Sequence, residues 1–262
     1  MLPFYRFCSG LPAFAESAEN RRRKFTLCDL WTFVYMGFFG VVMNQVCFTV
    51  GLRFTSVSHA AMIVGMGPIY TLILAVLFKL EEVTWRKTIG MAIALAGIAV
   101  LASENGISAH SPSVLGDAIT MTGSIGFAMY VVLGKRLGGR YDPLTMTAFS
   151  HYAGAVIVLP LAVCRAAALG SMEKWRAIAW TGWAAMLYMA IFSSAVAYVF
   201  YFWLLRYLEA SQLSAFTYLL PVVATILGIV WLGERGSWGQ VLGGVLALSG
   251  VYWIESGRAS VV

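Results

Sequence analysis

A long stretch of this chain occurs twice, and this internal repeat constrains the fold more than any other feature. Residues 53–100 align without a gap on residues 206–253 when the numbering is shifted by 153 positions. A chain that resembles itself at a fixed period is built from repeated structural units. The matched residues include types that apolar composition alone does not align: Pro68 with Pro221, Glu81 with Glu234, Trp85 with Trp238, Gly90 with Gly243, and Gly97 with Gly250.

The composition indicates that lipid is the solvent for much of the chain. Hydrophobic residues make up 60% of it and charged residues 11%, with a mean hydropathy of +0.79. Soluble domains carry about a quarter charged residues. The net charge is +6, but the basic residues lie between apolar runs rather than in one patch, so nucleic acid is not expected as a partner. The four cysteines lack the paired spacing of a disulfide framework or a metal site, and no cofactor or metal is expected.

Eight apolar runs are long enough to cross a membrane as helices, which takes about 20 residues each. The sequence therefore predicts an all-α integral membrane protein with eight transmembrane helices and short connections. The expected spans are residues 28–52, 57–78, 86–103, 115–134, 143–164, 178–204, 211–232 and 238–255.

The distribution of lysine and arginine predicts the orientation of these spans, because cytoplasmic loops carry an excess of both residues. When the basic run at 21–24 is placed in the cytoplasm, 13 basic residues fall on the cytoplasmic side and 5 on the far side. We expect a multi-pass protein of the inner (plasma) membrane with both termini in the cytoplasm.

The two copies of the repeat are predicted to run in opposite directions. Span 28–52 matches span 178–204 at the same shift, and five crossings, an odd number, separate them. Inverted repeats are typical of secondary transporters. Two helices of the first copy would precede residue 1 at this shift, so we expect an inverted repeat of five plus five helices without its first two helices. The predicted divisions are a cytoplasmic leader with the remnant of a lost helix (1–26), three helices of the first copy (27–104), a loop (105–114), the second copy (115–256) and a cytoplasmic tail (257–262).

The repeat also resembles a known family. GLRFTSVSHAAMIVGMGPIYTLILAVLFKLEE at 51–82 and LLRYLEASQLSAFTYLLPVVATILGIVWLGERG at 204–236 resemble the EamA-type repeat of the drug/metabolite transporter superfamily. The resemblance covers about 28–103 and 115–256. It implies a central cavity between two halves and a secondary transporter, an exporter of small metabolites such as amino acids or drug-like solutes, that works by alternating access.

Polar side chains deep in the spans are the candidates for binding a solute, because each costs free energy unless it has a partner or faces water. Packing between helices is an alternative of similar weight for them. Pro68 and Pro221 are predicted to kink their helices. The substrate-binding candidates are Asn44, Gln45, Tyr130, His151, Tyr198, Tyr201 and Tyr218.

All twelve carboxylates fall in loops or at span ends, so the sequence shows no buried acidic proton relay. His151 is the only predicted buried group that could titrate, which favours uniport or weak proton coupling.

Two other functions stay open. Ser124 and His151 could imitate the dyad of an intramembrane enzyme, although no enzyme activity is expected, and the chain could be a membrane protein that does not transport. The expected partners are a small-molecule solute and the lipid bilayer, and a homodimer is compatible with the sequence.

Overall fold

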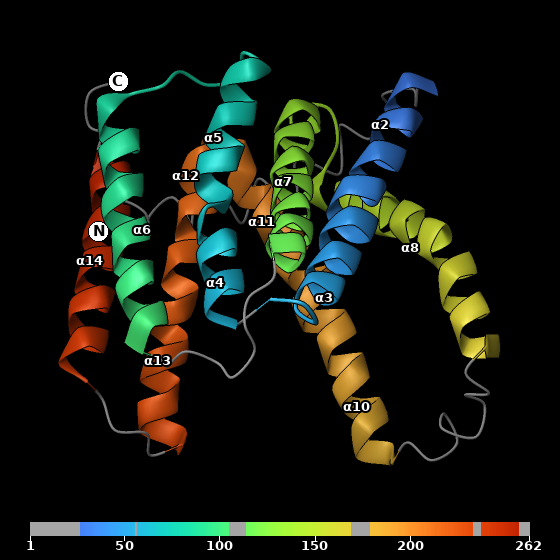
Figure 1. The fold of residues 1–262 in the computed structure, drawn as a ribbon. Helices are drawn as coiled ribbons and strands as arrows, with labels where there is room; N and C mark the ends of the chain where they lie inside the picture. The colour runs from blue at the N-terminus through green and yellow to red at the C-terminus, as the bar shows by residue number, and fades with distance from the viewer. Residues whose placement is uncertain (1–26, 56, 105–113, 169–178, 233–236, 257–262) are drawn as a thin grey trace.

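The structure, a computed structural model, describes residues 27–55, 57–104, 114–168, 179–232 and 237–256, and every regular element within these ranges is helical (Figure 1). The expected leader at 1–26, the loop at 105–113 and the tail at 257–262 lie outside the described residues. The elements are α2 (Leu27–Gly37), η1 (Phe38–Val46), α3 (Cys47–Gly51), α4 (Val57–Gly65), α5 (Gly67–Leu77), α6 (Trp85–Glu104), α7 (Val114–Leu137), α8 (Pro143–Ala168), α10 (Trp180–Tyr188), η2 (Met189–Val196), α11 (Ala197–Tyr207), α12 (Ala210–Ala215), η3 (Phe216–Tyr218), α13 (Leu219–Leu232) and α14 (Trp238–Ser256).

Within the described part of the chain, five helical stretches are long and apolar enough to cross a membrane, so the protein is an all-α integral membrane protein. Helices suit this environment because they satisfy their backbone hydrogen bonds internally. The expected spans at 86–103 and 143–164 fall on α6 and α8, which are helical but are not among the five, and the apolar helix Trp238–Ile254 is shorter. The five stretches are Asp29–Gly51, His59–Leu77, Val114–Leu137, Trp180–Tyr207 and Ala210–Leu227.

Helices α6 and α14 pack backbone against backbone along a seam of small residues. A Cβ atom added to Gly97 would lie 2.6 Å from the carbonyl oxygen of Gly243, and one added to Gly250 would lie 2.5 Å from the carbonyl oxygen of Gly90. Small residues allow this close approach in lipid, where van der Waals packing drives helix association. Because Gly90 faces Gly250 while Gly97 faces Gly243, the two helices are antiparallel.

The other matched segments also run in opposite directions. The helix from α2 to α3 descends in Figure 1 while the helix from α10 to α11 ascends, and α5 ascends while α13 descends. Each member of the first pair contains a π-helical stretch, η1 or η2. The 153-residue shift carries 38–46 onto 191–199, which overlaps η2 over residues 191–196.

The second pair of matched helices is interrupted near its proline in both copies. In the first copy α4 ends at Gly65 and α5 begins at Gly67, so Pro68 is the second residue of α5. In the second copy the short 3₁₀ helix η3 separates α12 from α13, and Pro221 is the third residue of α13. Proline fits the first turn of a helix because its missing N–H has no partner there.

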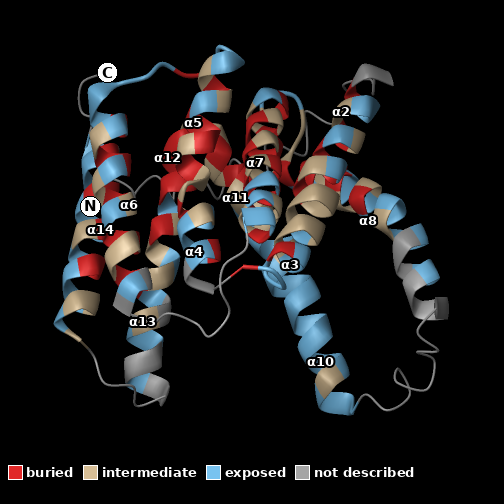
Figure 2. Ribbon diagram, in the orientation of Figure 1, coloured by how far each residue is buried: buried red, intermediate tan, exposed pale blue. Residues whose placement is uncertain are grey.

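Buried side chains gather where α5, α7, α11 and α12 meet, whereas α10 and η2 contain no buried residue (Figure 2). The largest fully buried side chains include Tyr130, Tyr218 and Phe33.

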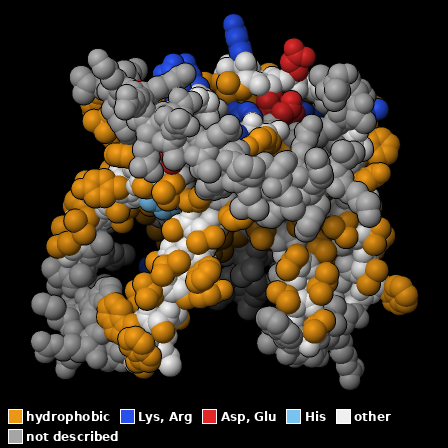
Figure 3. Space-filling model, turned by 180° about the vertical axis from the view of Figure 1, so that it is seen from behind, with side chains coloured by type: hydrophobic (Ala, Val, Ile, Leu, Met, Phe, Trp, Pro, Cys, Tyr) orange, Lys and Arg blue, Asp and Glu red, His pale blue; other side chains and the backbone are white. Residues whose placement is uncertain are grey.

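Charged side chains collect at one end of the molecule (Figure 3). There the buried carboxylate of Glu81 accepts hydrogen bonds from the backbone N–H of Ser211 at 3.1 Å and from Nζ of Lys87 at 3.1 Å. Glu81 also accepts from the Ser211 hydroxyl, and Lys87 forms a second ion pair with Glu209. Glu81 belongs to the first copy and Ser211 to the second, so this cluster joins the two copies.

Candidate functional site

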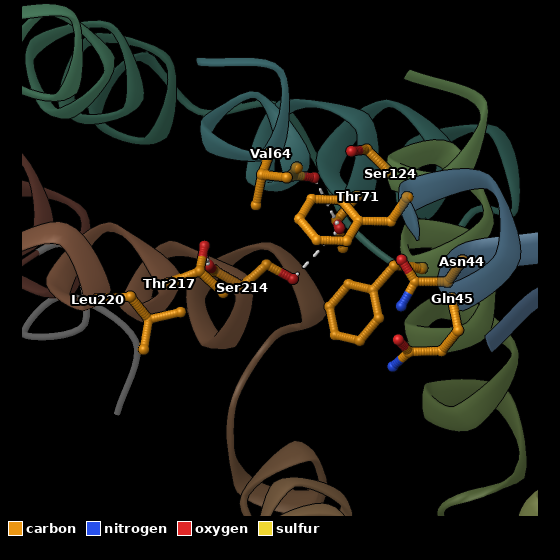
Figure 4. A pocket seen from close by; sticks show the side chains of 11 residues that line it. Asn44, Gln45, Val64, Thr71, Ser124, Ser214, Thr217 and Leu220 are labelled. Carbon is orange, nitrogen blue, oxygen red and sulfur yellow. Dashed lines mark hydrogen bonds between the residues drawn. The ribbon is translucent and has the colours of Figure 1, made fainter. Parts of the chain in front are cut away.

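A cavity of about 300 Å³ lies where the first span, the break between α4 and α5, α7, and the start of α13 come together (Figure 4). This volume is at the lower end of the range for small-molecule sites, about 300–1,000 Å³. Its lining consists of Asn44, Gln45, Phe48, Val64, Gly67, Thr71, Ser124, Phe127, Ser214, Thr217 and Leu220.

The two amides of the lining come from the π-helical stretch of the first span. Asn44 and Gln45 lie in the last turn of η1, and their side chains are on the opposite side of the cavity from Ser214 and Thr217 (Figure 4). Among the described residues, no side-chain hydrogen bond involves either amide. Each amide therefore offers two N–H donors and one carbonyl acceptor to a solute. Both residues were predicted as binding candidates, and they line the same cavity.

Hydroxyl groups form a directed chain along the other side of the cavity. Ser214 Oγ donates to Thr71 Oγ1 at 3.2 Å, and Thr71 Oγ1 donates to the carbonyl of Gly67 at 3.0 Å. The hydroxyl of Tyr201, 3.4 Å from Ser214 Oγ, then serves as the donor to Ser214. Tyr201 does not line the cavity, but it holds a residue that does, and the chain links the second copy to the first.

Three more predicted residues, Tyr130, His151 and Tyr198, pack together outside the lining. The rings of His151 and Tyr198 are 4.7 Å apart, and those of Tyr130 and Tyr198 are 5.8 Å apart. The Tyr130 hydroxyl lies 3.3 Å from Ser150 Oγ, and Nδ1 of His151 lies 2.9 Å from the Thr147 carbonyl. The cluster touches the cavity wall through Phe127, whose ring centroid is 6.3 Å from that of Tyr130.

Tyr218, the seventh predicted residue, lies in a different core. It is fully buried in a cluster with Leu72, Met91 and Ala215, and its hydroxyl has no hydrogen-bond partner among the described residues. It is therefore not brought together with the other candidates.

Most residues of the cavity lining were not among the seven predicted candidates. Thr71, Ser214, Phe48 and Phe127 were missed, and Ser124 and Thr217 were given less weight than the seven candidates. One signal could have found part of the lining: at the 153-residue shift Val64 matches Thr217 and Gly67 matches Leu220, and all four line the cavity.

The lining carries no ionisable side chain. Ser124 Oγ donates to the carbonyl of Thr120 at 3.3 Å, and His151 bonds the carbonyl of Thr147, so each is engaged with its own helix rather than with the other. Ser124 and His151, the two residues of the suggested dyad, are on α7 and α8, and no hydrogen bond joins them among the described residues.

At the charged end, neighbouring groups shift the pKa of two titratable residues outside the spans, Tyr141 and Asp142. Burial, the hydrogen bond to Asp29 and the negative charge of Asp29 raise the pKa of Tyr141 to about 12. The carboxylate of Asp142 accepts from the hydroxyl and backbone N–H of Thr145 at the start of α8. Burial raises the pKa of Asp142, but these bonds and the charge of Arg206 outweigh burial and hold it below its ordinary value.

Antiparallel apolar helices around an uncharged polar cavity define the chain as a multi-pass membrane protein, and comparison with known proteins supports this class. The model of the EamA-like transporter family matches residues 1–103 and 114–256. The chain therefore belongs to the EamA-like transporter family.

Several curated relatives are also named as transporters. An uncharacterized transporter of Archaeoglobus fulgidus is 28% identical over 88% of this chain and 79% of its own length. The uncharacterized transporter YyaM of Bacillus subtilis is 30% identical over 84% of this chain and 71% of its own length. A Streptantibioticus cattleyicolor protein named "Probable terminal-alkyne amino-acid exporter" is 28% identical, covering 87% of this chain and 73% of that protein.

A solved structure titled "Crystal structure of protein" shares the fold. It aligns with a TM-score of 0.71 over 97% of this chain and 84% of its own, at 16% sequence identity.

Proposed function

We propose that the protein is a secondary transporter that exports small solutes by alternating access, with the cavity as the solute site. One observation carries this proposal: the cavity is lined by the matched pairs Val64 with Thr217 and Gly67 with Leu220, one member from each copy. A site at the boundary of two inverted halves can be exposed first to one side of the membrane and then to the other as the halves exchange conformations.

The packing of α6 on α14 supports the inverted repeat. Gly90 contacts Gly250, the counterpart of Gly97, and Gly97 contacts Gly243, the counterpart of Gly90. Such reciprocal pairing is what a two-fold axis produces. On this basis the chain has eight spans drawn from an inverted arrangement of five plus five helices.

The charged end supports the proposed orientation in the plasma membrane. Lys87, Lys135 and Arg206, all assigned to the cytoplasmic side from the sequence, bond partners at this end of the helices. We place this end, and both termini, in the cytoplasm, following the excess of lysine and arginine on that side.

The seven candidate residues take different roles in this proposal. Asn44 and Gln45 bind the solute directly, Tyr201 orients Ser214, and Tyr130, His151 and Tyr198 support the wall through Phe127. Tyr218 holds the core between α5, α6 and α14. Amino acids and drug-like solutes are the two proposed substrate classes, and the first is the class that the name of the Streptantibioticus relative gives.

Transport by the purified chain in liposomes tests the proposal. Liposomes are loaded with a panel of labelled amino acids and uncharged aromatic amides, and efflux down the gradient is measured. We expect saturable efflux of at least one panel member. Replacing Asn44→Leu together with Thr217→Val should slow this efflux about tenfold, because two cavity groups lose their hydrogen bonds.

Thr122→Val is the matched control, because Thr122 is on α7 but is exposed, is not part of the lining and donates to the carbonyl of Ala118 at 2.8 Å. Efflux equal to that of protein-free liposomes for every panel member, or equal losses in the cavity and control variants, would contradict the proposal.

A further inference from the structure

We infer that the cavity selects uncharged solutes in which an apolar body carries a hydrogen-bonding donor next to an acceptor, as in a primary amide, a lactam or a ureide. This inference rests on the proposed function, since it takes the cavity as the solute site. It narrows the proposed substrates to uncharged drug-like solutes and sets aside the amino acids, which are zwitterions at neutral pH.

The absence of charge in the lining is the first argument. Every side chain of the lining is apolar, a hydroxyl or an amide. Two of the carboxylates near the ends of the helices have partners of their own: Glu81 is paired with Lys87, and Asp117 with Thr55 and His59. An ion taken into a site without a counter-ion loses hydration that nothing in the lining replaces. A solute with a full charge is therefore disfavoured here.

The hydroxyl groups supply acceptors rather than donors, because their hydrogens are already used. Thr71 donates to Gly67, Ser124 to Thr120, and Thr217 to the carbonyl of Ser214 at 2.7 Å. Ser214 donates to Thr71. A hydroxyl that has given its hydrogen keeps a lone pair with which it can accept.

The amides of Asn44 and Gln45 are the free donors of the lining, and each also presents an acceptor. A partner with the same pair of groups, one donor beside one acceptor, can bond an amide twice. A carboxylate would offer only acceptors, and it would leave the carbonyl oxygens of both amides unpaired. An ammonium would offer only donors, and it would leave the N–H groups unpaired. A polar group that the solute shields from water without pairing it loses hydrogen bonds to water and gains none in return.

The apolar part of the solute is set by the remaining wall. Phe48, Val64, Phe127 and Leu220 contribute only apolar surface. A phenyl ring or a branched alkyl group fits such a surface, because burying it is favourable in proportion to the area removed from water.

A matched series of probes tests the inference with the full chain in lipid nanodiscs, using isothermal titration calorimetry. The probes are 3-phenylpropanamide, 3-phenylpropanoate, 3-phenylpropylamine and phenylalanine, which are uncharged, anionic, cationic and zwitterionic at neutral pH. We expect the amide to bind at least about tenfold more tightly than each of the other three. Tighter or equal binding of any charged probe, or no saturable binding of the amide, would overturn the inference.

Substitutions of Asn44 and Gln45 test whether these two amides are the source of the selectivity. Gln45→Leu and Asn44→Leu should each weaken binding of 3-phenylpropanamide about tenfold, while Thr122→Val should leave it unchanged. Asn44→Asp keeps the shape and adds a carboxylate, so binding of 3-phenylpropylamine should tighten about tenfold. If the Asn44→Asp protein has the same selectivity as the wild type, the probes do not bind in the cavity and the inference is wrong.

Flux of the same probes in liposomes separates this inference from the proposed function. Selective binding of the amide without transport of any probe would overturn the transporter proposal and leave the selectivity standing. Transport of the anion in preference to the amide would overturn the selectivity and leave the transporter standing.

Discussion

Gly97 is one of the residues at which the packing of the two copies leaves no space for a side chain. An added Cβ would lie 2.5 Å from the backbone nitrogen of Ala247, so the neighbouring atoms that would have to move are backbone. Gly97→Leu should therefore destabilise the protein by about 3 kcal/mol or more, because overpacking cannot be relieved by a side-chain rotation. Unfolding in mixed micelles titrated with sodium dodecyl sulfate measures this. Gly139→Ala is the control, since no atom lies within 4 Å of its added Cβ, and a similar loss in both variants would contradict the prediction.

Asp142 gives a prediction that depends on pH. Its carboxylate caps α8, and Asp142→Ala should cost about 1 kcal/mol at neutral pH. The pKa is depressed in the folded state, so the stabilisation is present above the unfolded-state pKa and is lost as the pH falls through the lower folded-state pKa. The difference in stability between wild type and variant should therefore disappear in acid. A difference that grows as the pH falls would show that the sign is wrong.

His151 is predicted to have a small role in energy coupling. It bonds the carbonyl of Thr147, packs on Tyr198 and does not line the cavity. His151→Gln should change efflux by less than about threefold, and a pH gradient across the liposomes should not drive accumulation of the solute. Strong accumulation driven by a pH gradient that survives in the His151→Gln protein would contradict weak coupling.

The same residues show how far a site can be predicted from sequence. Asn44 and Gln45 were predicted because amides within an apolar run are costly without a partner, and both line the cavity. The tyrosines satisfied the same criterion, yet Tyr130 and Tyr198 pack against each other. The difference depends on which face of each helix points inward, and helices that are apolar on all sides do not reveal that face in their sequence.

At the scale of elements, the cluster around Glu81 fixes the end of α5 to the start of α12. Glu81→Gln leaves Lys87 with a weaker set of partners and should destabilise the protein by about 3 kcal/mol, since breaking a buried ion pair is costly. Unfolding of the purified variant in the same mixed micelles measures this. Glu82→Gln is the control, because its exposed side chain takes no part and only its backbone carbonyl accepts from Lys87. Equal stability of the two variants would show that the cluster is not a stabilising joint.

Helix ranges were easier to predict than helix geometry. The expected span 28–52 corresponds to the continuous helix of α2, η1 and α3 because apolar runs in lipid leave few alternatives to a helix. The π-helical stretches were not predicted, because a shift from i+4 to i+5 bonding has no compositional signature. The break at Met66 precedes Pro68 by two residues, which a kink argument from proline alone does not locate.

At the scale of the whole molecule, we propose that the protein consists of two antiparallel halves that share one cavity. Matched segments run in opposite directions, and matched residues of both halves line the cavity. The polar groups are not symmetric, because Asn44 and Gln45 correspond to Ala197 and Tyr198. Both amides of the lining belong to the first half, whereas three of its four hydroxyl side chains, Ser124, Ser214 and Thr217, belong to the second. We therefore expect a solute to bind in one preferred orientation.

The accessibility of Thr217 from the two faces of the membrane tests this central claim most directly. Thr217→Cys is made in a protein whose native cysteines are replaced by serine, and a membrane-impermeant thiol reagent is added to either face of oriented liposomes. Val230→Cys, on the exposed side of α13, is the control. The account predicts that the cysteine at 217 reacts from both faces and that saturating solute slows both reactions. Reaction from one face only, with and without solute, would contradict it.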